Sequence, residues 1–278
     1  MNHQSDNSKK SNTGARETLL NYDPTEISTQ PAGLNGAPEP ARTNATIERR
    51  QFLEHHLKGS PTDLESYMEL AQLYRDENRP ADARRVLQQA VQVFPDDGTV
   101  LWELEEAVLA RSLQQYREVL EISKKVESPE MDRELDRSAS DWACRRIEVC
   151  EARLERNPEL HDLRLALGEA LLDAGHHQNA IDAVTALLKE DTFSASASYL
   201  QGKCQLELGQ NHDAMRSFRA VALRRAVPAN PSLKRAALKL LALTAERIGA
   251  PRTFDLYQEH LKELESRTTP ESQENKSI

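Results

Sequence analysis

Residues 163–188 read LRLALGEALLDAGHHQNAIDAVTALL and residues 199–222 read YLQGKCQLELGQNHDAMRSFRAVA. The second segment repeats the small and large apolar positions of the first at a constant offset of 34 residues. The paired positions are Gly168 with Gly202, Gly175 with Gly209, Ala180 with Ala214, and Val184 with Phe218. A fixed period of this length, with two amphipathic helices per unit, predicts stacked helical hairpins that cover one another's apolar faces.

Amphipathic helical patterns continue on both sides of these two segments, over residues 44–267. Helix starts are predicted by a capping box at Thr62 and Glu65, and by the pairs Ser128-Pro129 and Asn230-Pro231. Helix ends are predicted where a residue suited to the left-handed conformation follows an apolar stretch, at Asn78, Gly175, Gly209 and Gly249.

The units resemble tetratricopeptide repeats. The best match is YMELAQLYRDENRPADARRVLQQAVQVFP, residues 67–95, which carries the pattern at Tyr67, Leu70, Ala71, Tyr74, Ala83, Leu87, Ala90 and Pro95. The two segments above carry it through their shared glycine, alanine and large apolar positions. The resemblance implies an all-α fold, a right-handed superhelical solenoid of antiparallel helix pairs, preceded here by a disordered N-terminal tail.

We expect clear repeat units at residues 64–97, 161–194 and 195–228, and a capping helix pair at 231–267. The stretch 98–160 departs from the repeat. There we expect two short helices (about 99–112 and 114–126) and one long helix (about 130–157). The long helix should bury one stripe, formed by Met131, Leu135, Ala139, Trp142, Ile147, Cys150 and Leu154.

Residues 1–43 and 268–278 are rich in polar residues and proline, without a helical period, so we expect both ends to be disordered. One island, TLLNYDPTEIS at 18–28, is either a random apolar cluster or a short linear motif.

Composition excludes several classes of protein. The net charge of -9 does not suit a dedicated duplex-DNA binder, and no run of about 18 apolar residues predicts membrane insertion. Three cysteines and no apolar leader favour a reducing, cytoplasmic setting. No phosphate-binding loop, nucleophile elbow or zinc motif is present, so we expect no enzyme activity, no cofactor and no metal.

In the family that the chain resembles, the first helix of each unit lines a concave groove, and a partner protein or peptide binds there. The positions carried over are Met68, Gln72, Arg75, Leu165, Glu169, Tyr199, Leu200 and Lys203. The basic clamp that some members use for a C-terminal carboxylate is largely missing. Leu165, Tyr199 and Leu200 either form an apolar groove floor for a partner helix or pack inside the array.

Charge is unevenly distributed, with a net +6 over residues 203–239 and a net -8 over residues 61–140. An alternative function is therefore salt-dependent binding of an acidic or phosphorylated partner or RNA, although nucleic acid is not the expected ligand because aromatic residues are scarce there. The residues of this basic patch are Arg216, Arg219, Arg224, Arg225, Lys234, Arg235 and Lys239. The simpler interpretation is a solvated helix face whose charges form ion pairs within the chain.

The last helical segment, 251–267, places Phe254, Tyr257, Leu261 and Leu264 at spacings of three, four and three residues. Such a stripe suits a terminal cap of the solenoid, whose outer side must be polar. It could equally form the seam of a homodimer.

Overall fold

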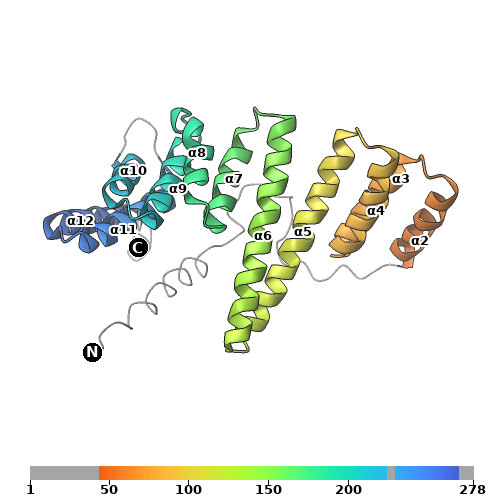
Figure 1. Cartoon of the computed structure of the whole chain (residues 1–278), viewed down its shortest axis with the longest axis horizontal. Helices are drawn as coiled ribbons and strands as arrows, with labels where there is room; N and C mark the ends of the chain where they lie inside the picture. The colour runs from red at the N-terminus through yellow and green to blue at the C-terminus, as the bar shows by residue number, and fades with distance from the viewer. Residues whose placement is uncertain (1–43, 224–228, 269–278) are drawn as a thin grey trace, which may run out of the picture. The chain divides into compact units, whose positions relative to one another are not determined.

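The computed structural model describes residues 44–223 and 229–268, and every regular element in these ranges is a helix (Figure 1). The predicted all-α fold is therefore confirmed for this part of the chain. Its elements are α2 (Asn44–Gly59), α3 (Leu64–Asp76), α4 (Pro80–Val93), α5 (Gly98–Ser123), α6 (Pro129–Arg156), α7 (His161–Asp173), α8 (His177–Thr185), the 3-10 turn η1 (Ala186–Lys189), α9 (Ser194–Glu207), α10 (Asn211–Leu223), α11 (Pro231–Arg247) and α12 (Pro251–Thr268).

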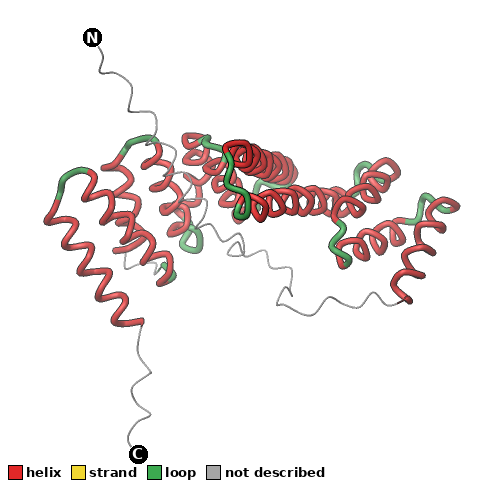
Figure 2. The backbone as a smooth tube through the Cα atoms, turned by 90° about the horizontal axis from the view of Figure 1, so that it is seen from below, coloured by secondary structure: helices red, strands yellow, loops and turns green. Residues whose placement is uncertain are grey.

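Each helix packs chiefly on the helices before and after it in the sequence, from α2 through α12. Short turns reverse the chain between them, so that neighbours run antiparallel (Figures 1 and 2). The buried side chains accordingly form successive clusters, one over α2–α5, one over α7–α9 and one over α9–α12. This sequential packing confirms the predicted solenoid of helix pairs.

Helix ends follow the sequence closely. Gly175, Gly209 and Gly249 have φ angles of 78°, 73° and 70°, and Asn78 has a φ of 55°, so all four predicted left-handed ends are confirmed. Ser128 and Asn230 cap α6 and α11 with side-chain oxygens that accept backbone N–H groups. The capping box at Thr62 is wrong: Asp63 caps α3 by accepting from the Ser66 N–H at 3.3 Å, because its carboxylate sits one residue nearer the helix.

The two helices of a repeat approach each other at glycine. A methyl group added at Gly168 would lie 2.5 Å from a methyl carbon of Val184, and one added at Gly202 would lie 2.6 Å from the Phe218 ring. The positions 34 residues apart in the sequence therefore make the same contact in successive units, a small residue in the first helix against a large one in the second.

The middle of the chain differs from the prediction of two short helices. Residues 98–123 form one continuous helix of 26 residues, α5, since no glycine or proline interrupts the stretch after Gly98. The long helix expected at about 130–157 is α6, at Pro129–Arg156. Its predicted stripe is partly wrong, because the buried residues are Ala143, Arg146, Val149, Cys150 and Arg153, while Met131, Leu135, Ala139, Trp142, Ile147 and Leu154 are half-buried.

The C-terminal stripe is used within the chain. Tyr257 and Leu261 are buried against the core of α11 and α10, and Phe254 and Leu264 pack at its edge. The two central side chains of this stripe are therefore covered within the chain, as the terminal cap predicts, and the homodimer seam stays a prediction. The tail predicted at 1–43, with its island at 18–28, and residues 269–278 lie outside the described residues.

We predict that Gly202→Ala lowers the free energy of unfolding by about 1–3 kcal/mol, because the Phe218 ring must move to admit the methyl group. Gly98→Ala is the matched control, since a methyl group there meets nothing within 4 Å. Thermal melts followed by circular dichroism measure both. Equal melting temperatures for the two variants would contradict the packing described above.

Candidate partner-binding groove

The first three predicted groove residues lie on α3, and two of them are engaged by neighbours. The Arg75 guanidinium donates to the Gln72 side-chain oxygen at 2.6 Å and pairs with Glu103 of α5. Exposed Gln72 in turn donates to the Asp76 carboxylate at 2.7 Å. Met68 is half-buried against the cluster of α2–α5. Arg75 therefore helps to join α3 to α5, and Gln72 is the exposed residue among these three.

Tyr199 and Leu200 are adjacent on α9, but their side chains have different surroundings. Leu200 is buried in the α7–α9 cluster, with a methyl carbon close against Gly168. Its predicted role as a groove contact is wrong, because one residue along a helix turns the side chain by about 100° and here turns it into the core. Tyr199 is half-buried and tilted against the Phe218 ring, with centroids 5.8 Å apart. Burial raises the pKa of the Tyr199 phenol.

Lys203 lies one turn beyond Tyr199 on α9, and its Nζ is 5.9 Å from the centroid of the Tyr199 ring. A lysine at this distance from an aromatic face gains a weak cation–π attraction. The two side chains thus form one half-exposed unit on the first helix of the third repeat.

Leu165 and Glu169 are neighbours one turn apart on α7. Leu165 is half-buried at the edge of the α7–α9 cluster. The Glu169 side chain is 29% exposed, and burial raises the pKa of its carboxyl group, a rise that the charges of Arg146 and Lys203 partly oppose. Burial likewise raises the pKa of Asp173, one turn further along α7.

Arg146 of α6 is the residue that binds this acidic pair, and the sequence did not predict it. Its side chain is 6% exposed, its Nη1 donates to Asp173 at 2.7 Å, and its Nη2 lies 3.7 Å from Glu169. The Trp142 ring stands 5.7 Å from the guanidinium carbon. We call Arg146, Glu169, Asp173 and Lys203 the charged cluster; it connects α6, α7 and α9.

A signal for Arg146 was present in the sequence. Ala143, Arg146, Cys150 and Arg153 recur at spacings of three, four and three residues, which places two arginines on the buried face of α6. Arg153 joins α6 to α5, with ion pairs of 2.8 Å to Glu105 and Glu106. The apolar stripe predicted from the sequence omits these arginines, because buried charge is rare unless it is paired.

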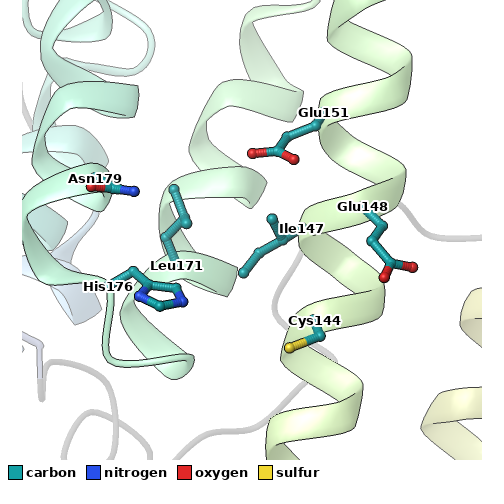
Figure 3. A pocket seen from close by; sticks show the side chains of 7 residues that line it. All are labelled: Cys144, Ile147, Glu148, Glu151, Leu171, His176 and Asn179. Atoms are coloured by element: carbon teal, nitrogen blue, oxygen red, sulfur yellow. The ribbon is translucent and has the colours of Figure 1, made fainter.

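A cavity of about 320 Å³ opens between α6, α7 and α8, and Figure 3 shows the side chains that line it, among them Cys144 of α6, Leu171 of α7 and His176 just before α8. Its lining mixes apolar and polar side chains but contains no nucleophile held by a base. Burial raises the pKa of Cys150, and that of Cys204 to about 11, so neither thiol is activated. Within residues 44–223 and 229–268, no three His, Cys, Asp or Glu side chains are grouped to hold a metal ion.

The residues of the basic patch lie in different surroundings. Arg219 donates to the Tyr257 hydroxyl at 2.6 Å, and the largely exposed Arg216 pairs with Asp213 at 3.2 Å. Lys234 and Arg235 are half-buried and Lys239 is exposed, whereas Arg224 and Arg225 lie outside the described residues. Arg216 and Lys239 thus offer the most accessible positive charge.

Successive helical hairpins with glycine contacts inside each pair define a helical repeat protein. Residues 64–109 and residues 165–231 each match a family model described as the tetratricopeptide repeat. These two regions are tetratricopeptide repeats, as the resemblance of their units predicted. Tetratricopeptide repeats are generally modules for protein–protein interaction, and their domains are typically not catalytic.

No curated protein matches the chain in a search of such proteins. Among the helices that the structure describes, none is long and apolar enough to cross a membrane.

We predict that Arg146→Met destabilises the chain by about 3 kcal/mol, because it leaves the partly buried Glu169 and Asp173 without their cation. The adjacent Arg145 is the control: its pair with Glu148 is more than half exposed on both sides, so Arg145→Met should cost less than about 1 kcal/mol. Urea unfolding followed by circular dichroism measures both. If both variants lose little unfolding free energy, Arg146 does not hold α6 and α7 together.

Glu169→Gln should change stability in a pH-dependent way. The folded state raises the pKa of this carboxyl group above its ordinary 4.5, so ionising the group costs more in the folded chain than in the unfolded one. Below 4.5 the wild-type group is neutral in both states, and the variant should match wild type. As pH rises through the folded-state pKa, the variant should become the more stable. Melts across this range test the sign, and a variant less stable at neutral pH would refute it.

Proposed function

We propose that this protein is a non-enzymatic interaction scaffold that binds a peptide or helix of another protein along the first helices of its repeats. The observation that carries the proposal is the half-exposed Tyr199–Lys203 unit on α9 beside the charged cluster of α6 and α7. Leu200 already fills the core position of this part of α9. Tyr199 and Lys203 are therefore left to the surface, within the region that matches the repeat family.

The side chains of this surface suggest the chemistry of the partner. Leu165 and Tyr199 offer apolar contact area, while Glu169 and Lys203 offer one charge of each sign. A segment that alternates apolar and charged side chains would satisfy both, with the aromatic ring as the main anchor. Met68, Gln72 and Arg75 extend the same set of first helices on α3, where Gln72 is the most exposed of the three.

The proposal is tested by selecting peptides from a random displayed library on the full chain and measuring their affinity for variants. Tyr199→Ala and Lys203→Ala should each weaken binding by about tenfold or more, since truncating a central aromatic or charged contact costs more than about 1 kcal/mol. Arg216→Ala is the control, because that side chain points to solvent on α10, a second helix.

Two results would overturn the proposal. Binding that survives Tyr199→Ala and Lys203→Ala, yet is lost with Arg216→Ala and Lys239→Ala and falls steeply with salt, would move the function to the basic patch. Selected peptides that bind all four variants as tightly as wild type would place the binding surface elsewhere on the chain. Circular dichroism of each variant distinguishes lost contact from lost fold.

A further inference from the structure

The α5–α6 hairpin is longer than the hairpins around it. α5 and α6 have 26 and 28 residues, whereas their neighbours α4 and α7 have 14 and 13. Figure 1 shows the turn-proximal halves of α5 and α6 running past the ends of the adjacent helices. We call residues 108–142 the arm. It projects by about 20 Å at a rise of 1.5 Å per residue.

The arm has many apolar side chains and no buried residue among positions 108–142, all of which the structure describes. Leu109, Leu113, Tyr116 and Leu120 recur at spacings of four, three and four residues and are only half-buried. At the tip, Ile122 and Val126 are 49% and 50% exposed. An isolated helix pair cannot cover its own apolar stripes, so this arrangement is typical of a surface completed by another chain.

One face of the arm is polar and can stay in water. A cavity of about 240 Å³ between its helices is lined on α5 by Arg111, Ser112, Gln115, Glu118 and Val119, four of them polar. Leu113 and Leu120 each follow two lining residues, by one and by two positions, which places them about 100° and about 200° around the helix from those residues. The apolar stripe of α5 therefore lies away from the polar cavity.

The two helices of the arm have opposite charge. Residues 111–125, on the α5 side, contain four basic and two acidic side chains, a net +2. Residues 127–141, on the α6 side, contain six acidic and two basic side chains, a net -4. A partner suited to this surface must present an acidic helix to α5 and a basic helix to α6. The arm of a second copy, related by a two-fold axis, presents both.

We propose that the arm is a self-association surface, through which two copies of this chain pair as an antiparallel four-helix bundle. In that bundle α5 of each copy faces α6 of the other, so both contacts join opposite charges. The half-buried stripe of α5, together with Ile122 and Val126, becomes the bundle core. This pairing leaves the first helices α7 and α9 available for the proposed groove.

The first test measures the oligomeric state of the full chain by sedimentation equilibrium, over about 1–200 µM. Wild type should reach a dimer, and the double variant Ile122→Glu, Val126→Glu should remain a monomer. The control is Leu243→Glu, Leu256→Glu, which charges equally exposed apolar side chains on α11 and α12 and should still form the dimer. A monomeric wild type, or a dimer that survives the arm variant and not the control, would overturn the proposal.

A charge-reversal pair tests the geometry itself. Arg117→Glu, Lys125→Glu makes both helices of the arm acidic, and Glu127→Lys, Glu130→Lys, Asp136→Lys changes the α6 side from a net -4 to a net +2, basic like α5; all five side chains are exposed. Each variant alone should self-associate at least about tenfold more weakly than wild type. An equimolar mixture should form the heterodimer, because each α5 then meets an opposite charge on α6. A mixture that associates no better than either variant contradicts the two-fold arrangement.

Discussion

The rest of the structure depends on the spacing between the two helices of a repeat. This spacing is set by the contact between a glycine in the first helix and a large side chain in the second. Gly168 admits Val184 and Leu200, and Gly202 admits Phe218. Because Leu200 enters the core beside Gly168, its neighbour Tyr199 is turned toward the edge and joins Lys203 at the surface. The proposed binding surface is thus a consequence of how one repeat closes on the next.

Where this contact is missing, buried ion pairs take its place. The stretch from 110 to 164 lies outside both repeat matches, and Arg153 attaches α6 to α5 while Arg146 attaches α6 to α7. Buried ion pairs depend on geometry more than apolar contacts do, so they hold two helices in one register. They occupy only the inner half of the long hairpin. Its outer half, residues 108–142, contains no buried residue, so the arm can present a separate surface.

The repeat units could be predicted from the sequence because glycine, alanine and large apolar residues recur in phase, and each has one steric role. The left-handed ends at Asn78, Gly175, Gly209 and Gly249 followed for the same reason. The full length of α5 could not, because the family match ends inside this helix at residue 109. The arginines of α6 were missed because their helical spacing places charge on the buried face. The sequence also did not distinguish whether Tyr199 or Leu200 faces the core. Only the packing of α9 on Gly168 separates a core residue from a surface one.

The first helices α7 and α9 are the proposed partner-binding surface. Hydrogen exchange of the full chain, with and without a saturating peptide selected on it, tests this claim most directly, because it locates the contact without any substitution. We expect added protection confined to α7, α9 and the adjoining part of α6. Protection centred on α10 and α11, with α7 and α9 unchanged, would contradict it.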